Sequence, residues 1–133
     1  MTARVYVLGG YQTDFAENWA RNGVEIFDAF HDTVKAACES VALEPEDVDV
    51  AHIGNFAAEL FCKQGHLGGF FAALHPAFSG LPASRHEAAC ASGSIAALSA
   101  SADIEAGRYG VAAVMGIEQM RNVPGEQAAD YIG

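Results

Sequence analysis

Cys90 is the residue of this sequence best placed for covalent chemistry. It is followed by Ala91, Ser92 and Gly93, whose small side chains leave room for a substrate to reach the sulfur. A cysteine at the beginning of a helix faces free backbone N–H groups, which favour the thiolate form and can also stabilise an oxyanion. We interpret this pattern as a nucleophile for acyl transfer. The alternative interpretation of Cys90 is a buried and inert thiol.

The other candidate side chains have simpler structural explanations. Cys38 falls on the apolar face of a predicted helix, and Cys62 has no neighbouring base in the sequence. His86 would share a strand face with Cys90, but four extended residues span roughly 13 Å, which is too far for a hydrogen bond. We therefore interpret His86 as a residue of the sheet or of an interface. Glu118 follows a predicted strand and is a candidate acid–base group.

Length and composition indicate one globular domain. The chain has 133 residues, 51% hydrophobic and 18% charged, with a net charge of −10. This acidity disfavours nucleic acid and anionic membranes as partners. Three cysteines without a paired motif, together with histidines that lack ligand spacing, predict reduced thiols and no metal. No signal peptide or membrane span is recognisable, so we expect a cytoplasmic protein without a bound cofactor.

Alternating strand and helix patterns predict the order β-α-β-α-β-α-β. We expect an α/β fold, a layered mixed sheet with helices on both faces and parallel strands joined by right-handed helical crossovers. The run 111–117 would be buried on both faces if it is central. Ligands collect at the carboxyl ends of such strands, and Cys90 follows the third one. The predicted strands are 3–9, 48–54, 84–89 and 111–117, and the predicted helices are 25–43, 63–74 and 91–106.

The predicted helix 91–106 carries small Ala, Gly and Ser residues nearly all round. A helix at a protein surface normally has a polar face, which is missing here before Asp103. We therefore expect this helix to be sandwiched between two layers, one of them outside this chain.

Four segments together resemble the thiolase family. Residues 87–98 (EAACASGSIAAL) resemble the nucleophile segment of thiolases, and residues 116–120 (GIEQM) are similar to their Gly-x-Glu-x-Met strand end. Residues 5–15 (VYVLGGYQTDF) and 122–133 (NVPGEQAADYIG) resemble the opening strand and a later loop of sterol-carrier-protein-type thiolases. The resemblance covers essentially the whole chain, with the motifs in the expected order.

This resemblance implies a thiolase-like N-terminal half. Residues 1–119 would form the α/β domain with Cys90 as the catalytic nucleophile, and residues 120–133 would begin the following loop region. The implied reaction is thiolytic cleavage of 3-ketoacyl-CoA, or the reverse Claisen condensation, through an acyl-Cys90 intermediate. Coenzyme A would be a co-substrate, the enzyme would serve fatty-acid metabolism, and the role of Glu118 would be structural.

The family's remaining catalytic groups are not found in this sequence. They are a Gly-His-Pro histidine, a second cysteine and an asparagine-bearing motif, so turnover would need the C-terminal half of a thiolase, in the same chain or in a second one. The resemblance also implies a homodimer or a dimer of dimers, in which the strand around Arg85–Ala89 pairs with its copy. Two alternatives remain: a condensing enzyme like β-ketoacyl synthase or hydroxymethylglutaryl synthase, and a non-catalytic, partner-dependent subunit.

Overall fold

A three-stranded parallel sheet forms the centre of the protein in a computed structural model, which describes residues 4–133. The strands are β1 (Val50–Gly54), β2 (Ala83–His86) and β3 (Ala112–Gly116), arranged in the order β2-β1-β3. In the register of the sheet, Ile53 lies opposite both Arg85 and Met115. The α/β class is confirmed, and the described strands supply the parallel part of the expected sheet.

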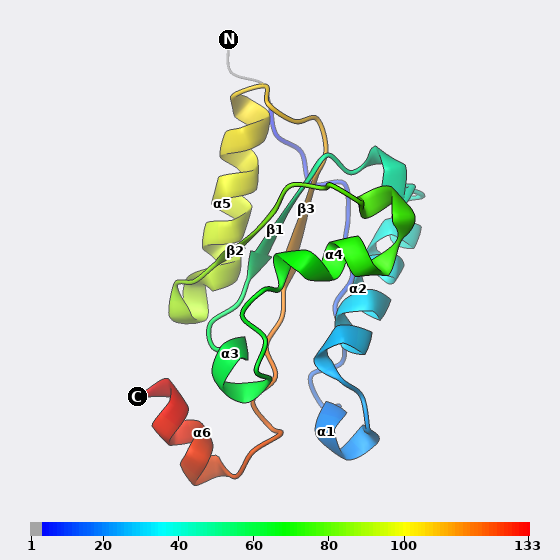
Figure 1. Cartoon of the computed structure of the whole chain (residues 1–133). Helices are drawn as coiled ribbons and strands as arrows, with labels where there is room; N and C mark the ends of the chain where they lie inside the picture. Colours follow the sequence, from blue (N-terminus) through cyan, green and yellow to red (C-terminus); the bar gives the residue numbers. More distant parts are fainter. Residues whose placement is uncertain (1–3) are drawn as a thin grey trace.

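Helices cover both faces of this sheet (Figure 1). Helix α5 (Ser92–Glu105) packs across all three strands on one face, and α4 (Gly68–Leu74) contacts β1 and β2 on the other, with α2 (Ile26–Ser40) against α4. Alternation along β1 explains the two layers, because His52 faces α5 whereas Ala51 and Ile53 enter the core beneath α2 and α4. The other described α-helices are α1 (Trp19–Asn22), α3 (Ala58–Phe61) and α6 (Gly125–Ile132).

The core is built on aromatic side chains from α2 and α4. Phe30 is fully buried, and its ring meets Phe70 and Phe71 edge-on at centroid distances of 5.3 and 5.1 Å. Such edge-to-face pairs stabilise a core beyond the area they bury. The predicted helix 25–43 ends earlier, at Ser40, because Ala42 adopts a left-handed φ of 52° that a right-handed helix cannot continue.

The strand predicted at 3–9 is wrong within the described residues. Residues 4–9 have no strand structure and make none of the backbone hydrogen bonds found in residues 4–133. Val7 is 93% exposed, so this apolar segment lacks the neighbours against which strand-forming side chains pack. It borders an apolar groove shared with β3 and α5. Residue 3 lies outside the described residues.

The fully buried strand is β1 rather than the one predicted to be central. All five residues of β1 are buried, whereas β3 lies at an edge of the described sheet and Val114 is 46% exposed. The strand predicted at 84–89 also ends early, at His86. Ala89 has a φ of 48° and begins a 3₁₀ turn, Ala89–Ala91, so the chain can no longer stay extended.

Helix α5 lies unusually close to the sheet. Ser92, Ala96 and Ala100 are its buried residues, and a Cβ placed on Gly54 of β1 would lie only 2.5 Å from the backbone nitrogen of Gly93. The opposite side of the helix exposes apolar side chains, including Leu98 at 66%. The predicted helix 91–106 is thus confirmed to within a residue at each end, and a covering layer outside this chain stays a prediction.

Three of the described helices, α1, α3 and α6, were not predicted from the sequence. Helix α3 follows β1 directly, and α6 occupies the tail that has no clear periodicity. Tyr131 of α6 packs edge-on against Phe61 of α3 at 5.2 Å, and Asn122 donates to the Phe61 carbonyl oxygen at 2.7 Å. The segment after residue 119 therefore packs back onto α3, and the boundary expected between residues 119 and 120 stays a prediction. No described helix combines the length and apolarity needed to cross a bilayer.

Candidate active site

Cys90 borders a pocket of about 700 Å³ at the carboxyl ends of β1 and β3. Its side chain is exposed, in contrast to the inert buried thiol of the alternative interpretation. Strands β1 and β3 end in Gly54 and Gly116, which leave the floor of the pocket without side chains. Lining residues come from the loop before α1 and from the segments that follow β1, β2 and β3. This is the sheet edge at which parallel α/β proteins bind ligands.

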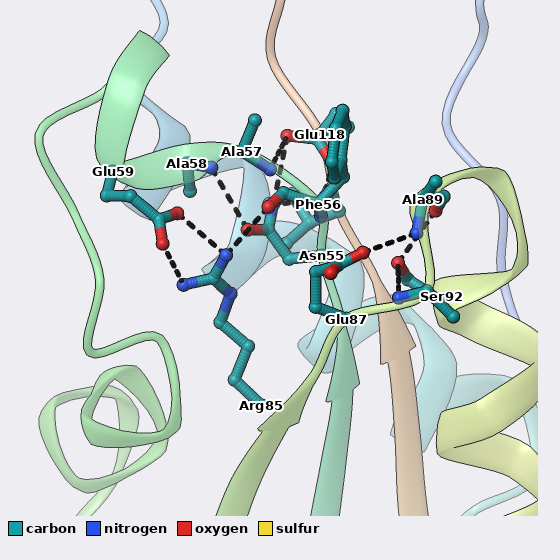
Figure 2. Close-up of polar contacts among 12 residues, drawn as sticks. Asn55, Phe56, Ala57, Ala58, Glu59, Arg85, Glu87, Ala89, Ser92 and Glu118 are labelled. Atoms are coloured by element: carbon teal, nitrogen blue, oxygen red, sulfur yellow. Dashed lines mark hydrogen bonds and ion pairs between the residues drawn. The ribbon is translucent and has the colours of Figure 1, made fainter. Parts of the chain in front are cut away.

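The turn that carries Cys90 is held by short side-chain hydrogen bonds. Ser92 Oγ accepts the Ala88 N–H at 2.9 Å and donates to the Ala89 carbonyl oxygen at 2.7 Å. A carboxylate oxygen of Glu87 accepts the Ala89 N–H at 2.5 Å (Figure 2). These bonds stabilise the left-handed conformation of Ala89, which a residue with a Cβ rarely adopts. As a result, Cys90 lies in a tight turn immediately before α5, as the sequence predicted.

A carboxylate joins the strand ends on the opposite wall of the pocket. Glu118, which follows β3, accepts the backbone N–H of Phe56 at 2.7 Å and that of Ala57 at 3.3 Å, and it accepts from Asn55 Nδ2 at 3.1 Å (Figure 2). Asn55 Nδ2 also donates to the Ile117 carbonyl oxygen at 2.7 Å. Glu118 therefore acts as a fixed acceptor that ties the loop after β1 to the end of β3. This arrangement matches the structural role implied by the resemblance.

The same loop is held from its other side by Arg85 of β2. One guanidinium nitrogen donates to the Phe56 carbonyl oxygen at 2.8 Å, and the guanidinium also binds both carboxylate oxygens of Glu59 at 3.0 and 2.7 Å. The hydrogen bond from Arg85 lowers the pKa of Glu59 below its usual value. Phe56 thus has its N–H held by Glu118 and its carbonyl oxygen held by Arg85. Neither Asn55 nor Arg85 was identified from the sequence as a site residue. Asn55 directly follows β1, and Arg85 lies in β2, just before residues 87–98.

A third wall of the pocket is the loop before α1. Arg121, which follows β3, donates to the carbonyl oxygens of Phe15 at 2.9 Å and of Glu17 at a shorter distance. Asn18 caps α1 by accepting the Arg21 N–H at 3.1 Å. Phe15 of this loop and Trp19, the first residue of α1, line the pocket with aromatic side chains. The chain segments before α1 and after β3 are therefore joined directly above the strand ends.

The other two cysteines differ from Cys90 in their surroundings. Cys38 and Cys62 are half-buried. Burial raises the pKa of the Cys38 thiol, with nearby Glu39 and Glu44 adding to the effect. Burial also raises the pKa of the Cys62 thiol, assisted by Glu118 and Glu25. Both thiols are therefore poor nucleophiles at neutral pH, which agrees with their interpretation as structural residues.

The described part of the pocket contains no histidine beside the thiol. No histidine is among its lining residues, and His86 points instead to His52, so its interpretation as a sheet residue is confirmed. Within residues 4–133 no three metal-ligating side chains gather into a group. The site thus offers a cysteine, the start of a helix and a rigid wall, and its described acidic groups are the carboxylates of Asp14, Glu17 and Glu118.

The structure defines an α/β domain with a parallel sheet and an exposed cysteine between β2 and α5, the helix that crosses the sheet. The chain belongs to the thiolase family, since the family model described as the N-terminal domain of thiolase matches residues 5–133. This match confirms the resemblance seen in the sequence.

The chain is also similar to curated archaeal enzymes. An acetyl-CoA acetyltransferase of Methanothermobacter thermautotrophicus is 34% identical over 119 residues, which cover 90% of this chain and 30% of that protein. An acetyl-CoA acetyltransferase of Methanocaldococcus jannaschii is 35% identical over 119 residues, covering 90% of this chain and 29% of that protein. The chain therefore spans about 30% of the length of these relatives.

Proposed function

We propose that this chain is the nucleophile-bearing part of a thiolase-type acyltransferase, with Cys90 as the nucleophile. The observation that carries the proposal is the position of Cys90, exposed in a pocket at the strand ends and directly before α5. Membership of the thiolase family and similarity to two acetyl-CoA acetyltransferases support it.

The proposed reaction is cleavage of a 3-ketoacyl-CoA. The Cys90 thiolate attacks the 3-keto carbon, and the resulting oxyanion collapses as the bond between C2 and C3 breaks. Acetyl-CoA leaves as an enolate that takes up one proton, and the acyl group remains on sulfur as a thioester. Coenzyme A, as its thiolate, then takes the acyl group and regenerates Cys90. The condensation runs through the same steps in reverse.

In this scheme the chain's own residues position the nucleophile. The hydrogen bonds of Ser92 and Glu87 hold the turn around Cys90, and the free backbone N–H groups at the start of α5 favour negative charge beside it. Glu118 and Arg85 fix Phe56 in the facing wall. These residues hold backbone groups in place, and we expect the base to come from a further segment, as the thiolase resemblance implies.

We expect that segment to bring the groups known from the thiolase resemblance, in the same polypeptide or in a second chain. Acyl-CoA is then the substrate, coenzyme A the co-substrate, and no bound cofactor is needed. A cytoplasmic homodimer serving fatty-acid metabolism is part of the same proposal. β2 supports it, because it is an edge of the described sheet and leads into the Cys90 turn.

Cleavage of acetoacetyl-CoA tests the proposal. We expect the longer protein to be active, the Cys90→Ala variant to be inactive and the Cys62→Ala variant to keep its activity. The 133-residue chain alone should be slower by at least about 10²-fold, because general acid–base catalysis alone contributes that much. An active Cys90→Ala variant, or full turnover by the short chain, would contradict the assignment. Trapping of an acyl group on Cys90 by mass spectrometry gives an independent readout.

Two alternatives make different forecasts in the same experiment. A condensing enzyme of the β-ketoacyl synthase or hydroxymethylglutaryl synthase type would acylate Cys90 but would not cleave acetoacetyl-CoA with coenzyme A. A non-catalytic subunit would leave Cys90 unmodified even in the complete protein.

A further inference from the structure

A cluster of four polar side chains lies between α5 and the strands β1 and β2, away from the Cys90 pocket. His52 of β1 is only 5% exposed, and its Nδ1 lies 2.9 Å from Nε2 of His86 on β2. Ser84 Oγ lies 3.0 Å from the same His86 nitrogen and 3.5 Å from His52 Nδ1. On the other side, His52 Nε2 lies 3.2 Å from a carboxylate oxygen of Asp103 on α5. These contacts join Asp103, His52, His86 and Ser84, in that order, and so connect α5, β1 and β2.

The contacts of the cluster indicate which of its ring nitrogens carry protons. A bond of 2.9 Å between two imidazole nitrogens needs one proton between them, so one nitrogen donates and the other accepts. The contact of His52 Nε2 with Asp103 is close enough for an ion pair but is not aligned as a hydrogen bond. A carboxylate at this distance stabilises positive charge on the ring. Asp103 also lies 3.6 Å from Arg108, which is largely exposed.

We propose that the Asp103–His52–His86–Ser84 cluster is a proton-binding site that couples the attachment of β2 to pH. A single positive charge fits the cluster, because it can rest on His52 beside Asp103 while His52 donates to His86. A second proton does not fit. It would place N–H groups on both facing nitrogens, which breaks the 2.9 Å hydrogen bond and sets a second positive ring, on the half-buried His86, beside the buried His52.

The electrostatics of His86 support this arrangement. Burial lowers the pKa of His86 below its usual value of 6.5, and the charge of nearby His52 lowers it further. The folded protein therefore binds this proton more weakly than the unfolded chain does. Stability from this group is fully present above pH 6.5 and is lost as the pH falls toward the lower pKa of the folded state.

Protonation of His86 affects β2, the strand that leads to Cys90. His86 is the last residue of β2, and its carbonyl oxygen accepts the Asn55 N–H at 3.1 Å. Its side chain is thus one of several attachments that hold the end of β2 against β1 and the loop after it. Loss of the imidazole bond in acid loosens β2 just before the Glu87–Cys90 turn, so a drop in pH acts on the edge strand first.

Imidazole titration by NMR and urea unfolding between pH 5 and 8 test the proposal on the 133-residue chain. We expect the His86 ring to titrate below its usual pKa of 6.5. The unfolding equilibrium constant should rise by up to about tenfold for each pH unit below about 6.5. In His86→Gln this rise should shrink, whereas the matched control His66→Gln, at an exposed loop position, should keep it.

The proposal is overturned if His86 titrates at or above 6.5, or if His86→Gln and the wild-type chain lose stability in parallel. If the variant fails to fold, the titration of His86 in the wild-type chain still decides the question.

Discussion

Glu118 accepts the backbone N–H of Phe56 at 2.7 Å and thereby joins the ends of β3 and β1, which are 62 residues apart in the sequence. The carboxylate belongs to the segment after one strand, and the N–H group belongs to the loop after its neighbour. Parallel strands bring their carboxyl ends to the same edge, so one acidic side chain can hold two loops of the pocket together.

We predict that Glu118→Ala destabilises the chain by about 1–3 kcal/mol, because it leaves the partly buried donors of Phe56, Ala57 and Asn55 without their acceptor. Glu118→Gln, which keeps one acceptor oxygen, should cost less. Urea unfolding at pH 7 measures both. Glu46→Ala, at an exposed position in the turn before β1, is the control and should change stability by no more than about 0.5 kcal/mol.

Gly54→Ala should be destabilising by about 1–3 kcal/mol, the usual cost of overpacking. Its Cβ would meet backbone atoms of α5 at 2.5 and 2.6 Å, and backbone cannot move aside as a flexible side chain can. Thermal unfolding measures the effect. Gly65→Ala is the matched control, since a Cβ at that position meets nothing within 4 Å. Equal stability of the two variants would contradict the close approach of α5 to β1.

Cys90 should be the thiol that iodoacetamide modifies first at neutral pH. It is exposed, whereas Cys38 and Cys62 are half-buried with raised pKa values and therefore carry less thiolate. Brief labelling followed by peptide mapping measures the order. Faster modification of Cys62 than of Cys90 would count against the nucleophile assignment. In urea the three rates should converge, which shows that the difference comes from the fold.

The proposed dimer places residue 87, the midpoint of the predicted pairing segment Arg85–Ala89, next to its own copy. Directly opposed residues of antiparallel strands lie about 4.5–5.5 Å apart, within reach of a disulfide bond. In a Cys90→Ser background, Glu87→Cys should therefore cross-link two chains under mild oxidation, and Glu46→Cys should not. Light scattering that shows a monomer at micromolar concentration would exclude this mode of association.

The sequence alone determined helices α2 and α5, the strands β1 and β3 and the position of the candidate nucleophile. Helix α2 follows from its apolar spacing, β1 and β3 from short apolar runs, and α5 from small residues that end at Gly107. Cys90 was found because a cysteine followed by small residues is a local pattern, complete within a few positions. Patterns of this kind can be recognised in the sequence, because the spacing of apolar residues and the size of side chains concern residues that are close together along the chain.

Only the tertiary structure decided which of these elements meet. Residues 4–9 have strand-forming composition, yet they stay unpaired because strand pairing depends on a partner that composition does not specify. The contacts of Glu118 with Phe56, of Arg85 with Glu59 and of His52 with His86 join residues 26 to 62 positions apart. The spacing of residues along the sequence does not predict these contacts. They form because the strand order β2-β1-β3 and the directions of the side chains bring the residues together.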